Sequence, residues 1–312
     1  MRRFIILFFC CASFIAASGQ QICFDEQLRE GDAFVKAGQI QEAINSWKAG
    51  IRQCRDLSAS QLATLNSRIR DAENAGVVTP SVITTPASQS YEPEMVSVQG
   101  GTFQMGSNNG SSDEQPVHSV TVSSFSMGKY EVTQKQWREV MGSDPSELYF
   151  KGCDQCPVER VSWIDIQEYL KKINEKTGKK YRLPTEAEWE FAARGGNQSK
   201  NYTYSGSNDL KSVAWFTENS ESKTHPVGQK QANELGLFDM SGNVWEWCSD
   251  WYSSSYSSGA VSNPTGAVTG ANRVFRGGSW GHNAASCRSA NRNFNTPTIR
   301  SFHVGFRVVF SL

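Results

Sequence analysis

The stretch that decides the fold is Gly236-Leu-Phe-Asp-Met-Ser-Gly-Asn-Val-Trp-Glu-Trp247, which combines turn-forming residues with two tryptophans. Blocks of similar composition flank it at 95–106, 131–137, 157–163, 182–190, 276–280 and 305–307. Seven of the nine tryptophans fall in or beside these blocks. Because each tryptophan buries a large apolar area, we expect them to form a core and not a platform for a ligand.

Short strands and helices are expected around these blocks. Residues 95–105 alternate in polarity and contain Gly100-Gly101, which predicts two strands paired across a tight turn. Another strand is expected at 120–125. Helical periodicity predicts helices at 133–141 and 162–177.

Local sequence signals predict both the start and the end of one further helix. Thr185 and Glu188 have the spacing of a capping box, and Gly195-Gly196 follow as a stop signal. The remainder of 94–312 is mostly Gly, Ser, Asn and aromatic residues with little periodicity. The sequence therefore predicts long ordered loops, held by disulfides, a bound cation or buried tryptophans.

Composition excludes some classes of protein. Lys plus Arg is 31 and Asp plus Glu is 31, so the net charge is zero, and 11% of residues are aromatic. An intrinsically disordered chain would have few aromatics and a high net charge. A nucleic-acid partner is not expected, because phosphate contacts require an excess of basic residues.

The N-terminus has the features of a targeting segment. Arg2 and Arg3 precede an apolar run at 4–15 and small residues at 16–19. This pattern predicts a secretory signal peptide at 1–20, with an N-terminal membrane anchor as the alternative. The protein is thus expected to be secreted, periplasmic or at the cell surface, with no transmembrane segment after cleavage.

Two segments separate the signal from the main domain. Residues 21–75 have the small and large alternation of a helical hairpin and resemble a single tetratricopeptide repeat. This hairpin is either a partner-binding module or a spacer. Residues 76–93 are rich in Pro, Thr and Ser and predict an extended linker, which leaves 94–312 as one domain.

Cysteine usage predicts disulfides. Cleavage of the signal removes two of the eight cysteines, Cys10 and Cys11, and leaves an even number in an oxidising compartment. Cys153 and Cys156 form a CxxC unit without a second CxxC or a histidine pair nearby, which makes zinc improbable. Cys23 and Cys54 flank the helical hairpin and are expected to staple it.

Taken together and in order, the blocks resemble the formylglycine-generating enzyme, or sulfatase-modifying factor, family over essentially all of 94–312. The resemblance implies an α+β fold, a loop-rich variant of the C-type lectin fold. Enzymes of this family oxidise a sulfatase cysteine to formylglycine, with a copper-binding cysteine pair after a Gly-Gly-Ser motif. Here His282 stands at the first of those positions, and Cys287 lies near the second or, in another alignment, outside the pair. Oxidase activity and copper are therefore not expected, and Cys287 with His282 would serve only if the protein were an oxidase.

The resemblance implies two further features. Cys248 lies in a block expected near the Gly-Gly-Ser strand, which suggests a Cys248–Cys287 disulfide. This pairing would leave Cys153–Cys156 and Cys23–Cys54 as the other disulfides. The family binds Ca²⁺ through the stretch that matches 239–246. Carried over by position, the ligands are the side chains of Asp239 and Glu246 and the carbonyls of Gly242 and Val244.

The C-terminal block 281–304 has an unusual composition, because it contains no Glu, Lys, Gln, Met or Trp. Each of its residues can be encoded by a codon that ends in a pyrimidine. The block resembles the variable region of proteins diversified by retroelements, although such a composition is also compatible with an ordinary Asn/Arg-rich block of the family. The residues expected to bind a ligand are His282, Phe294, Ile299, Phe302 and His303.

These observations favour a ligand-binding or scaffold protein that lacks the catalytic cysteine pair. Its partner would be an unknown protein or cell-surface ligand. The alternatives are an oxidase that converts a sulfatase cysteine to formylglycine, and a cell-envelope scaffold for motility or secretion.

Overall fold

The computed structural model describes residues 24–25, 28–29, 32, 35, 40–54, 57–75 and 91–311. The predicted signal peptide, Cys23 and most of the predicted linker lie outside these residues. The chain divides into two compact units, Met1–Thr85 and Pro86–Leu312, and the division falls within the predicted linker. No helix among the described residues is long and apolar enough to cross a membrane.

The described residues of the smaller unit include two helices, α2 (Ile40–Gln53) and α3 (Ala59–Ala75), and Phe24 packs in the same apolar cluster. Trp47 is 2% exposed at the centre of its core, and Leu65 of the facing helix is fully buried. Cys54 is disulfide-bonded. Because Cys23 lies outside the described residues, the expected Cys23–Cys54 pairing stays a prediction, as does the resemblance to a tetratricopeptide repeat.

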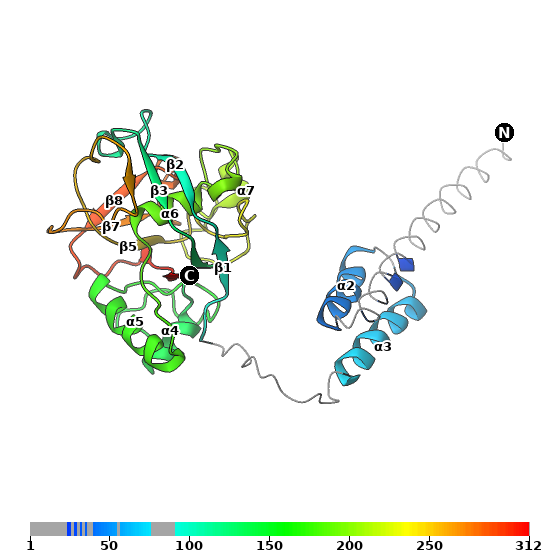
Figure 1. The fold of residues 1–312 in the computed structure, drawn as a ribbon. Coiled ribbons are helices and arrows are strands. Elements are labelled where there is room, and N and C mark those ends of the chain that lie inside the picture. The colour runs from blue at the N-terminus through cyan, green and yellow to red at the C-terminus, as the bar shows by residue number, and fades with distance from the viewer. Residues whose placement is uncertain are drawn as a thin grey trace, which may run out of the picture. The chain divides into compact units, whose positions relative to one another are not determined.

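The larger unit contains three small sheets (Figure 1). The first has the antiparallel order β1 (Met95–Val98), β4 (Phe125–Gly128), β10 (Val309–Ser311). The second has the order β2 (Gly101–Met105), β3 (His118–Val122), β6 (Val261–Ser262). The third has the order β8 (Arg292–Asn295), β7 (Arg273–Arg276), β5 (Trp245–Trp251), β9 (Val304–Gly305).

The expected pairing of two strands within 95–105 is wrong. Both strands exist, but β1 pairs with β4 and β2 pairs with β3, so they belong to different sheets. The chain turns at Gly100, where a Cβ would lie 2.5 Å from the carbonyl oxygen of Val122. This close approach to the end of β3 separates the two strands.

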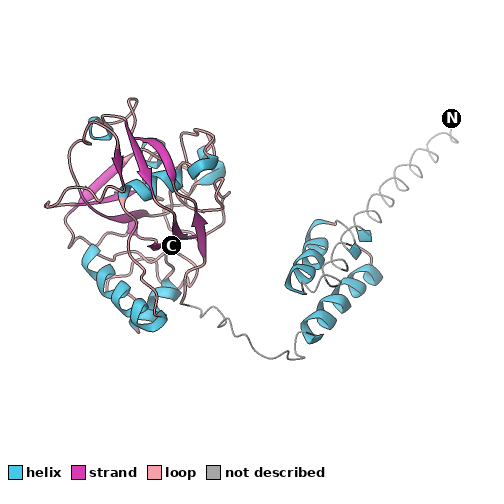
Figure 2. Cartoon of the chain, in the orientation of Figure 1, coloured by secondary structure: helices cyan, strands magenta, loops and turns pink. Residues whose placement is uncertain are grey.

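Three helices of the larger unit begin where the sequence predicts them: α4 (Gln134–Met141), α5 (Trp163–Thr177) and α6 (Glu186–Ala193). The single turn α7 (Leu210–Val213) was not predicted. A capping box opens each of the first three, and Thr185 accepts a hydrogen bond of 3.1 Å from the amide of Glu188 as expected. Figure 1 shows α4 and α5 together at one end of the unit and β2 and β3 at the other. Loops make up much of the rest (Figure 2).

Four of the seven tryptophans in the blocks lie in the core, as predicted, whereas Trp163, Trp251 and Trp280 are half-buried. Trp189, Trp245 and Trp247 are at most 1% exposed. Trp137 of α4 stacks on Tyr169 of α5, with ring centroids 5.3 Å apart. The predicted Cys153–Cys156 disulfide is also confirmed and closes a tight loop between these two helices. The mixed helices and sheets agree with the expected α+β class.

Candidate functional site

Two imidazoles meet in the loops that follow β7 and precede β9. The turn Gly277-Gly278, with φ of 102° and 78°, leads from β7 to Ser279. The buried hydroxyl of Ser279 lies 2.7 Å from Nδ1 of His282 and 3.2 Å from Nδ1 of His303, so one group holds both rings. A Cβ on Gly281 would lie 2.4 Å from Cε1 of His303, which explains a glycine at this position.

Aromatic side chains surround the imidazoles. The ring centroids of Trp280 and His303 are 4.5 Å apart, and those of Phe302 and His303 are 4.4 Å apart. Phe150 meets Trp280 edge-on at 5.3 Å, and Tyr149 lies 5.2 Å from Phe302. Such separations are typical of favourable ring contacts. We call this set the ring cluster: Tyr149, Phe150, Trp280, His282, Phe302 and His303.

The ring cluster is open to solvent, and its own side chains carry no formal charge. The carboxyl group of Glu159 accepts hydrogen bonds from the amides of Tyr149 and Phe150, and Arg160 pairs with Glu147. Tyr149 is 60% exposed, and the guanidinium of Arg160 lies 5.4 Å from the centroid of Phe302. Burial, together with the neighbouring His282, lowers the pKa of His303 to about 4. Burial also lowers the pKa of His282. Both imidazoles are therefore neutral at neutral pH and present hydrogen-bonding groups without charge.

The structure brings together three of the five residues expected to bind a ligand, His282, Phe302 and His303. Phe294, on β8, stacks on Tyr252 with ring centroids 3.7 Å apart. Ile299 packs against the apolar core. Those two side chains thus lie outside the ring cluster.

Sequence reasoning missed Tyr149, Phe150 and Arg160. These residues lie far from block 281–304 in the chain, so no local pattern connects them to it. The only available signal was a pair of adjacent aromatic residues just before the CxxC unit. The Cys153–Cys156 disulfide closes the loop that follows them.

The expected Cys248–Cys287 disulfide is wrong, because both cysteines are free and buried. Cys248, on β5, packs in the core with Val274 of β7. Cys287, at the end of the 3₁₀ turn Ala284–Cys287, packs instead with Phe216 and its neighbours. The two thiols therefore belong to different apolar clusters.

Burial also changes the chemistry of these thiols. It raises the pKa of Cys287 to about 12 and that of Cys248 well above its usual value, so neither is a thiolate at neutral pH. His282 contacts Ser279 and Trp245. No hydrogen bond joins His282 to Cys287 among the described residues. This arrangement does not resemble a two-thiolate copper site.

A second group of polar residues contains the expected calcium ligands. Glu246 is fully buried, and both of its oxygens accept 2.6 Å hydrogen bonds from Arg307. Glu131 accepts hydrogen bonds from the amide of Val244 and from the side chain of Asn243. Burial raises the pKa of Glu131 well above its usual value, and the charges of nearby carboxylates raise it further. We call Glu131, Asp239, Glu246 and Arg307 the carboxylate cluster.

Asp239 is the member of this cluster that fits a cation. Oδ2 accepts a 2.7 Å hydrogen bond from the amide of Gly228, whereas the buried Oδ1 has no partner among the described residues. Glu246 fits less well because Arg307 and Trp189 already occupy its oxygens. The described residues also hold no group of three His, Cys, Asp or Glu side chains arranged around one point. A cation here would depend on Asp239 Oδ1 and on main-chain carbonyls.

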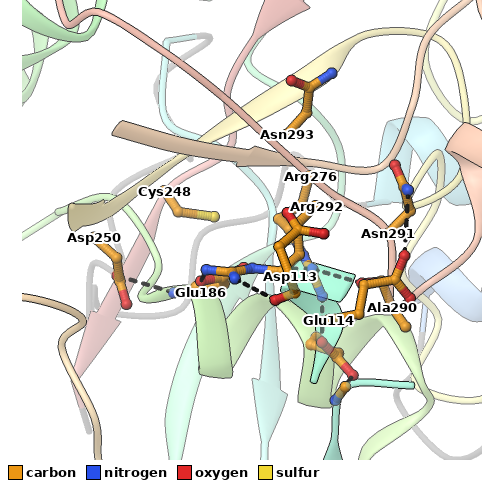
Figure 3. A network of polar contacts seen from close by, with 12 residues as sticks. Asp113, Glu114, Glu186, Cys248, Asp250, Arg276, Ala290, Asn291, Arg292 and Asn293 are labelled. Atoms are coloured by element: carbon orange, nitrogen blue, oxygen red, sulfur yellow. Dashed lines mark hydrogen bonds and ion pairs between the residues drawn. The ribbon is translucent and has the colours of Figure 1, made fainter. Parts of the chain in front are cut away.

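A third network fixes the base of block 281–304 (Figure 3). Arg292 forms two hydrogen bonds to Glu186, at 2.6 and 2.8 Å, and Arg288 pairs with the buried Glu114. Arg276 pairs with the same Glu186 and is fully buried. These charge-assisted bonds attach the block to the framework from within.

Comparison with known proteins agrees with this architecture. Residues 81–312 match the sulfatase-modifying factor enzyme 1-like domain. Chaperone protein LppX of Paenibacillus barcinonensis is 40% identical over 229 residues, which cover 57% of this chain and 79% of that protein. The formylglycine-generating enzyme of Streptomyces coelicolor is 40% identical over 168 residues, or 48% of this chain and 51% of the enzyme. The chain thus spans about half the length of that relative.

A solved structure extends the likeness to three dimensions. Treponema denticola variable protein 1 matches with a TM-score of 0.65 and 32% identity, over 70% of this chain and 95% of that one. The domain match covers most of this chain, and the structural match covers nearly the whole of the other protein. This chain therefore belongs to the sulfatase-modifying factor, or formylglycine-generating enzyme, family and has its C-type-lectin-like fold.

Proposed function

We propose that this protein binds a ligand outside the cell or at its surface and is not an oxidase. Block 281–304 and the ring cluster form the binding surface. The observation that carries the proposal is that His282, Phe302 and His303 of this block meet Tyr149, Phe150 and Trp280 in one solvent-accessible cluster. Rigid rings beside small polar side chains suit adaptable recognition.

Block 281–304 contains both buried residues, which attach it to the framework, and exposed residues. Cys287, Ser289, Ala290 and Arg292 are buried, and the arginine network holds them to the framework. The exposed residues are Gly281, Asn283, Ala285, Phe294, Asn295, Thr296, Thr298 and Arg300. Because buried residues hold this block in place, its exposed residues can be substituted without loss of the fold. This supports the idea that the block is diversified.

The relatives fit this proposal. The similarity to a protein named variable protein 1 extends over 95% of that protein. The enzyme relatives support the alternative of an oxidase. That alternative needs a reactive thiolate, whereas burial raises the pKa of Cys287 to about 12.

We expect sequence variants of this gene within one population to concentrate in block 281–304. Changes should fall at exposed or half-buried positions such as His282, Asn283 and Phe302, and should be rare at Cys287 and Arg292, which are buried. The measurement is deep sequencing of the gene, with residues 182–190 as the internal control. A template repeat and a reverse transcriptase gene nearby are also expected.

Two outcomes would contradict the proposal. One is variation spread evenly over the buried and exposed positions of the block. The other is conversion of a cysteine in a sulfatase-derived peptide to formylglycine by the copper-treated protein. In that case Cys287→Ser would show whether this thiol is the one that acts.

A calcium site at Asp239 is a second proposal, supported by the unpartnered Oδ1. The carbonyls of Gly242 and Val244 and a shared Glu246 would complete its oxygen ligands. We expect calcium to raise the melting temperature relative to EGTA, because an ion that binds only the folded state stabilises it. Asp239→Asn should abolish this shift, and Asp209→Asn, at an exposed site, should leave it intact. Equal melting temperatures with calcium and with EGTA would rule the site out.

A further inference from the structure

A groove lies apart from the ring cluster and from the carboxylate cluster. Its volume is about 580 Å³, and none of the residues of either cluster lines it. It opens between the start of α5, the segment that leads into α6, the β3–β4 turn and the loop after β6. This volume is within the usual range for a site that takes a small molecule.

Most of the residues that line this groove carry neutral hydroxyl or amide side chains, although more of its exposed surface is apolar than polar. Six of them are Ser124, Gln167, Thr185, Ser249, Asn263 and Thr265. Gln167 and Thr265 make no side-chain hydrogen bond to any other residue that the structure describes. Their amide and hydroxyl groups therefore remain available as donors and acceptors for a ligand.

The charged residues of the groove are already paired. Arg182 donates two hydrogen bonds of 2.7 Å to the two oxygens of Glu188. Such a bidentate pair is planar and geometrically fixed. An ionic ligand would have to compete with this pair for its partner. The groove therefore favours a ligand without net charge.

Trp163 supplies a fixed apolar wall. Its Nε1 donates a 3.0 Å hydrogen bond to the carbonyl of Cys248, and the guanidinium of Arg273 lies 4.0 Å from its ring centroid. These contacts hold the indole in one orientation at the edge of the groove. A flat apolar surface beside hydroxyl and amide groups complements a ring whose faces carry C–H groups and whose rim carries hydroxyls.

Some of the main-chain groups around the groove are paired. Arg182 and Val309 exchange two backbone hydrogen bonds of 2.8 Å, which pair the outer edge of β10 at Val309. The amide of Asn263 donates to the carbonyl of Thr121. At these positions a ligand would meet side chains and not free main-chain groups.

From these hydroxyl and amide side chains, the paired charges and the indole held in one orientation, we propose that the groove binds a neutral saccharide. The proposal is independent of the ring cluster, because no residue is shared. A failure of one therefore leaves the other standing.

The test is binding of neutral saccharides to the full chain. A glycan array that carries neutral, sialylated and sulfated glycans selects the probe, and calorimetry then measures its affinity. Gln167→Leu and Thr265→Val remove hydrogen-bonding groups at nearly constant shape and should each weaken binding by about tenfold. The matched controls, Gln198→Leu and Thr269→Val, change exposed residues outside the groove and should leave affinity unchanged.

Three results would overturn the proposal. The first is that no neutral glycan binds. The second is that only anionic glycans or peptides bind. The third is neutral-glycan binding that the Gln167 and Thr265 variants do not weaken, while Tyr149→Ala in the ring cluster does, because the saccharide site would then be the ring cluster.

Discussion

Arg307→Met is expected to destabilise the protein by about 3–5 kcal/mol, the usual cost of removing one partner of a buried ion pair. Arg307 is fully buried, forms two hydrogen bonds to Glu246 and donates to the carbonyls of Gly128 and Phe238. Without it, the carboxylates of Glu131, Asp239 and Glu246 lose their buried counter-charge. A loss of this size is a large part of the stability of an ordinary domain.

The matched control is Arg300→Met. Arg300 also forms two hydrogen bonds to one carboxylate, that of Asp165, but its side chain is 42% exposed. Surface pairs of this kind contribute about 0–1 kcal/mol, so urea unfolding should separate the two variants clearly. Arg307→Lys keeps the charge but not the planar fork, so its loss of stability should lie between those of Arg307→Met and Arg300→Met. It can be measured in place of Arg307→Met if that variant does not fold. Equal losses for Arg307→Met and Arg300→Met would show that burial does not amplify the interaction.

The features that could be predicted from the sequence are local in the chain. The helices were predictable because Thr133, Ser162 and Thr185 cap them within one turn. The tryptophan core followed from residue size alone. Strand pairing was not predictable, because β1 and β2 are neighbours in sequence and find partners in different sheets.

The cysteines and the ring cluster also depend on contacts between distant segments, which the sequence alone does not reveal. An even number of cysteines suggested three disulfides, but parity carries no information about which side chains face the core. Cys248 and Cys287 each lie in an apolar cluster, where a thiol packs as a small hydrophobic group. In the ring cluster, Tyr149 contacts Phe302, although most of the domain's sequence separates the two residues. Only the arrangement of the folded chain shows that contact.

Asp250→Asn is expected to stabilise the protein at pH 8 and to have little effect at pH 5. Asp250 is 3% exposed, and its Oδ2 accepts hydrogen bonds from the amide of Glu186 and the hydroxyl of Ser249. Burial and then the charge of Glu186 raise its pKa to about 7, and Glu188 acts in the same direction. The charge of Asp250 in turn helps to raise the pKa of the Cys248 thiol and partly offsets the lowering by burial of the pKa of Arg273.

The sign of the pH dependence follows from proton binding. In the unfolded chain this carboxyl ionises near pH 4, whereas in the folded protein it holds its proton up to about pH 7. The folded state therefore loses stability between these values as pH rises, by about 4 kcal/mol for a group of this kind. Asparagine cannot ionise. Its variant should keep at pH 8 the stability that the protonated acid gives at pH 5.

Asp165→Asn provides a control of opposite sign. Burial raises the pKa of Asp165, but its bonds to Arg300 and Ser162 outweigh burial and lower the pKa overall. Its contribution is present above the pKa of the unfolded chain and is lost in acid, so Asp165→Asn should destabilise at pH 8 and have less effect near pH 3. Urea unfolding across this pH range measures both variants. If Asp250→Asn changed stability by the same amount at pH 5 and pH 8, the carboxyl would be ionised at both pH values. The Ser249 and Glu186 donors would then outweigh the cost of burial.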